Sequence, residues 1–108
     1  MYFPVPSLLT EFLILAIVEK KASYGYEISQ TVKLVADIKE STLYPILKKL
    51  EKSGYLSTYS EEHQGRKRKY YTITSSGHAQ LDFLKTEWSN YSHTITDIIE
   101  GRLRHEKD

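Results

Sequence analysis

Residues 41–55, STLYPILKKLEKSGY, combine a helical apolar stripe with a row of polar and basic side chains. The apolar side chains recur at the i, i+3, i+4 and i+7 positions of one helix face: Leu43, Ile46, Leu47 and Leu50. Gly54 is typical of the position just after a helix end. This pattern predicts a helix over residues 40–53, although Pro45, which removes a backbone hydrogen bond, favours a later start.

Two further helices are predicted upstream. Ser7 is a suitable N-cap for a helix over residues 7–20, where apolar residues follow at helical spacing. Ser23 is a suitable N-cap for a shorter helix that ends near Val35. Its expected buried face consists of Tyr24, Ile28, Val32 and Val35. Three helices are therefore expected before residue 54.

A hairpin and a last helix follow. Tyr55–Ser60 and Lys69–Thr74 are rich in Tyr, Thr and Ile and flank a polar, basic loop that contains Gly65, which predicts an antiparallel hairpin. Thr74 or Ser75 then opens a helix whose apolar residues alternate in steps of three and four, as in heptad a and d positions. This seam consists of Leu81, Leu84, Trp88, Tyr91, Ile95 and Ile98.

The seam predicts self-association. A domain of this size cannot fully bury such a stripe, so we expect a homodimer in which Phe12 of the first helix also takes part. Further residues could cover the partner helix: Tyr2, Phe3 and Val5. The alternative is that the stripe packs only on its own domain.

The order of elements predicts a mainly α fold with a β-hairpin wing. We expect a winged helix-turn-helix domain over residues 1–74 and a C-terminal dimerisation helix over residues 75–108. The formal net charge is only +1, but residues 39–70 contain eight Lys or Arg and four Glu. In this fold the third helix lies in the major groove and the wing touches the backbone, so double-stranded DNA is the expected partner.

The predicted DNA contacts form two groups, which differ in what their side chains can reach on the duplex. Ser41, Thr42 and Tyr44, near the start of the third helix, are expected to meet base edges or phosphates and to provide specificity. The basic residues are expected to provide affinity through phosphates, those of the hairpin loop lying beside Gly65. They are Lys39, Lys48, Lys49, Lys52, Arg66, Lys67, Arg68 and Lys69.

Composition argues against other classes. The chain has no cysteine, and its four histidines lack the spacing of metal ligands, so neither a metal site nor a cofactor is expected. No grouping of catalytic residues indicates an enzyme. The longest apolar run, Phe12–Val18, is too short to span a bilayer, and no export signal precedes it, which favours a cytoplasmic protein.

Three motifs in order resemble the PadR family of bacterial transcriptional regulators: YGYEI at residues 24–28, STLYPILKKLEKSGY at 41–55, and GRKRKYYTIT at 65–74 with Gly77. The short C-terminal helix resembles the smaller PadR subfamily. The resemblance implies a homodimeric repressor on a partly palindromic operator, released by a small molecule. It also implies that Tyr44-Pro45 lies within the recognition helix, and Lys39 stands where relatives often have a capping Ser or Asn.

The single tryptophan, Trp88, falls at an a position of the seam. In a dimer, two copies of this tryptophan could face each other across the symmetry axis. Multidrug-responsive relatives bind flat aromatic drugs between such a pair of tryptophans, which makes Trp88 and Ser92 candidate ligand contacts. Ser92 stands where those relatives have an acidic residue that holds cationic drugs, so a cationic ligand is less favoured. The alternative is a packed interface tryptophan with no ligand.

Two other functions compete with DNA binding. A winged-helix module used for protein contacts would carry the same basic face without sequence-specific DNA binding. The nine tyrosines also suggest RNA binding as an alternative function. However, Tyr24, Tyr55 and Tyr71 fit core or hairpin positions better than a platform on which bases stack.

Overall fold

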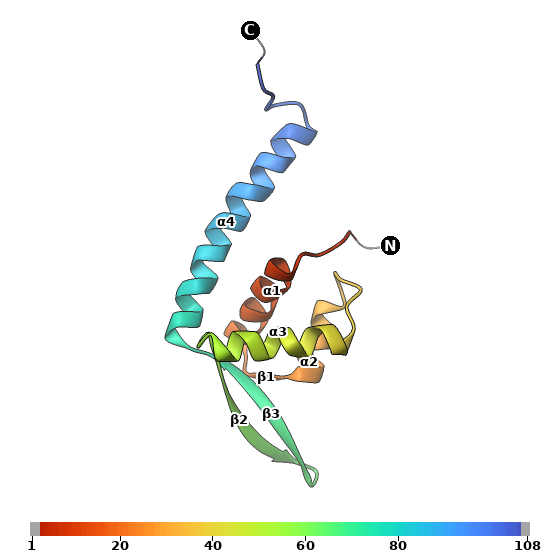
Figure 1. Cartoon of the computed structure of the whole chain (residues 1–108), viewed down its shortest axis with the longest axis vertical. Helices are drawn as coiled ribbons and strands as arrows, with labels where there is room; N and C mark the ends of the chain where they lie inside the picture. Colours follow the sequence, from red (N-terminus) through yellow and green to blue (C-terminus); the bar gives the residue numbers. More distant parts are fainter. Residues whose placement is uncertain (1–2, 107–108) are drawn as a thin grey trace.

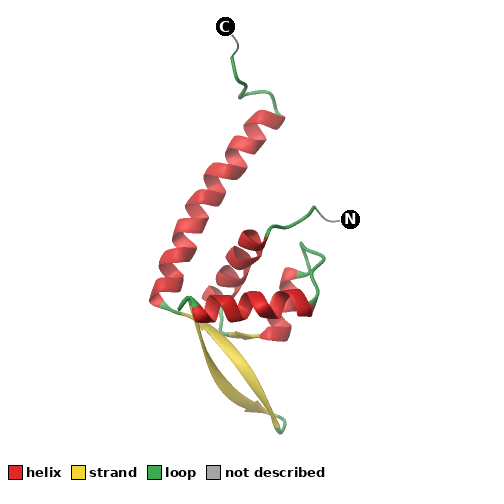
Figure 2. Cartoon of the chain, viewed as in Figure 1, coloured by secondary structure: helices red, strands yellow, loops and turns green. Residues whose placement is uncertain are grey.

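The structure, a computed structural model, describes residues 3–106 and has the predicted winged-helix fold (Figures 1 and 2). The elements, in chain order, are α1 (Ser7–Lys20), β1 (Ser23–Tyr24), α2 (Gly25–Val32), α3 (Glu40–Lys52), β2 (Leu56–His63), β3 (Arg66–Ile73) and α4 (Ser75–Ile99). The strands form an antiparallel sheet of order β1-β3-β2. Helices α1 to α3 and the first turns of α4 surround one core that includes Ile14, Leu15, Ile28, Leu43, Leu47, Leu50 and Leu81.

The bounds of α1 are as predicted, but its cap is not. Pro6 is the N-cap, without a side-chain hydrogen bond, and Ser7 is the first helical residue. The predicted Ser23 cap of the second helix is also wrong, because Ser23 pairs with Tyr71 of β3 as part of β1. Pairing to a residue 48 positions away in the chain cannot be recognised from local periodicity.

Helix α2 begins and ends differently from the prediction. It starts at Gly25, where the Glu27 carboxylate accepts a hydrogen bond of 3.2 Å from the Tyr24 backbone N–H. It ends at Val32, so Val35 lies in the loop and is 51% exposed. Ala36, and not Val35, is the residue that is buried in this part of the chain.

Helix α3 agrees with the prediction within one residue. Lys39 is the N-cap without a side-chain hydrogen bond, and Gly54 follows the last turn. Pro45 lies inside the helix, as the resemblance implies, so a later start is excluded. The Glu40 carboxylate accepts hydrogen bonds from Ser29 Oγ at 3.1 Å and Lys33 Nζ at 2.9 Å, and these bonds tie the start of α3 to α2.

The wing is longer than predicted. Its strands pair from Leu56 and Ile73 out to His63 and Arg66, and Gln64 and Gly65 form the turn with φ of 50° and 78°. Positive φ at both turn residues is the geometry of a type I′ hairpin turn, which continues the strand twist. Residues 66–68, predicted as part of the loop, therefore lie in β3, where successive side chains point to opposite faces.

Helix α4 has two parts with different surroundings. Thr74 caps it by accepting a hydrogen bond of 3.0 Å from the Gly77 N–H, and Leu81 and Leu84 enter the core. The remainder extends away from the domain (Figure 1), which gives a radius of gyration of 16.9 Å against about 13 Å for a compact chain of this size. No helix in residues 3–106 is both long and apolar enough to span a bilayer.

Candidate nucleic-acid interface

One side of α3 is exposed from its first turn to its last. The predicted contact residues on it are all exposed: Ser41, Thr42, Tyr44, Lys48, Lys49 and Lys52, with Lys39 just before the helix. The opposite side carries the buried leucines of the core. Hydrogen bonds from Lys33 and Ser29 hold the pKa of Glu40 below its usual value. The start of α3 is thus fixed relative to α2, as a helix that enters a groove requires.

Two predicted DNA-contacting cations are held by carboxylates of the same chain. Lys49 Nζ lies 2.9 Å from Glu11 Oε2 on α1. Lys69 Nζ donates to Glu51 Oε1 at 3.2 Å, and Thr58 Oγ1 donates to Glu51 Oε2 at 3.3 Å. The hydrogen bond to Glu51 raises the pKa of Lys69 above its usual value. These contacts join α3 to α1 and to the wing, so both lysines are partly neutralised.

The other cations are differently placed. Within residues 3–106, no ion pair or side-chain hydrogen bond engages the following exposed residues: Lys39, Lys48, Lys52, Arg66 and Lys67. Arg66 and Lys67 lie next to the wing turn. The Arg68 guanidinium instead lies over the Tyr24 ring, 4.4 Å from its centroid. The structure thus distinguishes cations that are free to meet phosphates from those that already have partners.

A hollow of about 300 Å³ joins α3 to the wing. Tyr44 of α3 borders it together with Arg68 and Lys69 of β3, and Tyr24, Gly25 and Tyr26 close it from the start of α2. Tyr71 forms its floor as a buried residue, and burial raises the pKa of this phenol. None of residues 24–26 is among the predicted site residues, and Tyr24 is predicted on the buried face of a helix. The sequence feature that could have indicated this part of the site is Gly25, a glycine between two tyrosines at the start of a helix.

The seam of α4 is only partly internal to the domain. Leu81 and Leu84 are buried in the core of the same chain, and the Phe12 ring lies 6.5 Å from that of Trp88. Beyond them, apolar side chains lie exposed on α4, by 38% to 77%: Trp88, Tyr91, Ile95, Ile98 and Ile99. Of the predicted covering residues, Phe3 is exposed, Val5 packs against the core, and Tyr2 lies outside the described residues.

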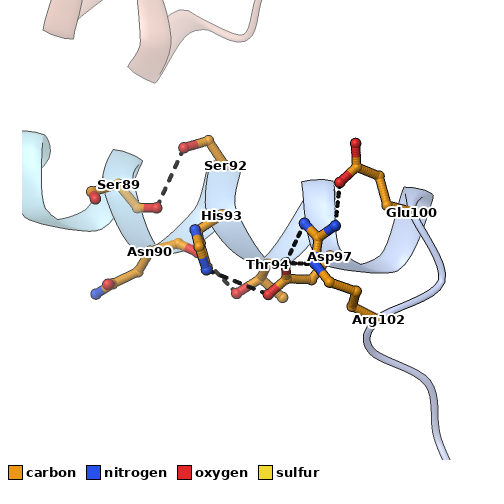
Figure 3. A network of polar contacts seen from close by, with 8 residues as sticks. All are labelled: Ser89, Asn90, Ser92, His93, Thr94, Asp97, Glu100 and Arg102. Atoms are coloured by element: carbon orange, nitrogen blue, oxygen red, sulfur yellow. Dashed lines mark hydrogen bonds and ion pairs between the residues drawn. The ribbon is translucent and has the colours of Figure 1, made fainter.

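The polar side of α4 carries its own contacts (Figure 3). Arg102 pairs with Asp97 and Glu100, and His93 Nε2 lies 3.5 Å from Asp97 Oδ2. Ser92 points to the other side of α4 (Figure 3), four residues after Trp88, and its hydroxyl donates to the Ser89 carbonyl oxygen of the same helix at 3.3 Å. The polar side thus has partners within the chain, whereas the apolar side chains from Trp88 onward stay exposed.

Comparison with known proteins gives consistent results. Residues 14–83 match the model of the transcriptional regulator PadR-like family. The uncharacterized protein X of Lysinibacillus sphaericus is 40% identical over 94 residues, which are 82% of this chain and 86% of that protein. A crystal structure from Streptococcus mutans UA159 has 68% identity and a TM-score of 0.94, covering 98% of this chain and 100% of that chain. A PadR family transcription regulator from Clostridium difficile R20291 has 33% identity and a TM-score of 0.78, covering 83% and 97%.

Proposed function

Because the chain belongs to the PadR-like family of transcriptional regulators, we propose that it is a homodimeric repressor that binds a palindromic operator in double-stranded DNA and is released by a small aromatic or phenolic ligand. Regulators of this family are DNA-binding transcription factors, not enzymes. One observation carries the proposal for this chain: Tyr44 on the exposed side of α3 borders the same hollow as Arg68 and Lys69 of β3, so one duplex can meet both elements. A repressor of bacterial genes acts in the cytoplasm.

Within this proposal, the two parts of the chain have separate roles. Residues 1–74 bind DNA, with Ser41 and Thr42 near base edges and the free lysines and arginines on phosphates. Residues 75–108 join two copies through the exposed part of the seam, from Trp88 to Ile98. A two-fold dimer presents two recognition helices, which matches a palindrome of two half-sites.

Removing a free cation should weaken DNA binding regardless of sequence. Lys48→Ala and Arg66→Ala are each expected to lower affinity for an operator selected from a random pool and for a random duplex alike. Each should also reduce the slope of log K against log salt by about one unit, because one phosphate contact is lost. Fluorescence anisotropy titrations from low to high salt measure both effects.

Arg104→Ala is the matched control, because Arg104 is exposed and follows α4, at the end far from the wing (Figure 1). It should leave affinity and salt slope unchanged. If Lys48→Ala and Arg66→Ala bind as the unaltered protein does, these cations do not contact DNA. If the unaltered protein selects no sequence from the pool, a protein-binding winged helix replaces the proposal.

The ligand proposal predicts a role for Trp88. A planar phenolic compound is expected to bind the dimer between the two Trp88 rings, and Trp88→Ala should lower its affinity about tenfold through lost ring contact. Isothermal titration calorimetry is the measurement, since fluorescence would change with loss of the tryptophan itself. Phe83→Ala, an exposed aromatic of α4 outside the seam, is the control. Equal affinity in Trp88→Ala and Phe83→Ala would exclude a site at Trp88.

A further inference from the structure

The hollow between α2, α3 and β3 has the chemistry of an anion site. Two cations of β3 and the Tyr44 side chain border it, and no carboxylate is among its lining residues. Lys69 is bound to Glu51, which leaves Arg68 as the cation of this hollow without an anionic partner in residues 3–106. Glu61 lies opposite Arg68 in the strand register, yet the two form no ion pair.

Arg68 is held by an aromatic row. Its guanidinium carbon lies 4.4 Å from the centroid of the Tyr24 ring, and no side-chain hydrogen bond engages its N–H groups within residues 3–106. The Tyr24 ring meets that of Tyr70 at 5.5 Å, and Tyr70 stacks on Tyr59 at 5.4 Å with an interplanar angle of 8°. These tyrosines face one another across β1, β3 and β2. This row of rings restricts the movement of the Tyr24 ring and therefore the position of the Arg68 guanidinium group.

Tyr44 is positioned by the absence of a side chain at Gly25. A Cβ atom on Gly25 would lie 2.6 Å from Tyr44 Cε1 and 3.3 Å from its hydroxyl oxygen. Only glycine therefore lets the Tyr44 ring rest against the start of α2. Because Tyr44 is 43% exposed, a larger residue would displace the ring into solvent and leave the fold in place.

We propose that this hollow binds one phosphodiester of the operator backbone, with Arg68 and the Tyr44 hydroxyl as donors, and that Gly25 is a positioning residue for Tyr44. A phosphodiester offers acceptor oxygens and one negative charge, which match a guanidinium edge and a phenol. Tyr44 then orients the duplex backbone, and base selection by α3 falls to Ser41 and Thr42. This inference rests on the proposed DNA binding.

The first test removes single phosphate charges from the DNA. Operators with one methylphosphonate at each successive position are titrated with the unaltered protein and with Arg68→Gln. One position per half-site should weaken the unaltered protein about tenfold, and the same substitution should cost Arg68→Gln less than about threefold. Additive effects at every position would overturn the hollow as a phosphate site. Failure of the unaltered protein to bind any duplex would overturn the proposed function as well.

The second test addresses Gly25. Gly25→Ala should lower operator and random-duplex affinity about fivefold, the worth of one hydrogen bond, without lowering the melting temperature, since alanine favours helices. In a Tyr44→Ala background, the same change at Gly25 should cost nothing. An equal loss in both backgrounds would show that Gly25 does not act through Tyr44. A loss confined to particular operator sequences would instead assign Tyr44 to a base.

Discussion

Gly77→Ala is expected to destabilise the protein by about 3 kcal/mol, which lowers the melting temperature of a domain of this size by roughly 15 °C. A Cβ atom on Gly77 would lie 2.1 Å from the Tyr55 carbonyl oxygen and 2.7 Å from an Ile73 side-chain carbon. The Tyr55 carbonyl cannot move away freely, because it accepts the Thr74 backbone N–H at 3.1 Å. Relief of the clash must therefore move α4 away from the wing.

Thermal melts followed by circular dichroism at one protomer concentration measure this effect, because the proposed dimer would make the melting temperature depend on concentration. Ser75→Ala, an exposed change in the same helical turn, is the control and should melt within a few degrees of the unaltered protein. A Gly77→Ala variant that melts with the control would mean that the approach of α4 to Tyr55 is looser than in the structure.

Ile95→Asp is expected to produce a monomer and to abolish tight operator binding. Ile95 lies within the exposed seam, between Tyr91 and Ile98, and is 38% exposed in the single chain. An unpaired carboxylate in an apolar interface should raise the dimer dissociation constant more than about 100-fold. Operator affinity should fall by about the same factor, because two half-sites no longer bind as one unit. Sedimentation velocity and anisotropy titrations measure the two effects.

Asn90→Asp is the matched control, because it places the same charge on the opposite side of α4, where the side chain is exposed. It should leave the dimer intact. If Ile95→Asp remains dimeric, the apolar seam of α4 does not hold the copies together, and the two-half-site proposal loses its basis. If it is monomeric but binds the operator normally, each half-site is sufficient by itself.

Local patterns predicted the elements that are governed by local chemistry. The bounds of α1 and α3 follow from helical spacing of apolar residues, and Gly54 follows α3 as its usual role indicates. Of the two residues that the sequence offers as the start of the last helix, Thr74 is the N-cap and Ser75 the first helical residue. The order of three helices, a hairpin and a long helix was sufficient for the winged-helix fold. These features were predictable because the interactions that set them join residues only a few positions apart.

The errors share one physical cause. Local patterns favour a cap at Ser23 and a loop over residues 66–68, yet both lie in strands whose partners come from other parts of the chain. Helix α2 likewise ends at Val32, and Ala36 in place of Val35 is buried in the core. Pairing and burial between distant segments override local preference, and a single sequence contains no direct record of them.

The sequence by itself determined the fold class, the third helix, the basic wing and the apolar seam, because each follows from the types and the spacing of residues. Only the tertiary structure decided which of these residues are free. In the folded chain Lys49 pairs with Glu11, Lys69 pairs with Glu51, and Arg68 lies over the Tyr24 ring. Leu81 and Leu84 are buried, whereas the apolar seam is exposed from Trp88 onward. The physical reason is that a side chain's role depends on its neighbours in space, and charge or apolar surface is available to a partner only where the chain has not already used it.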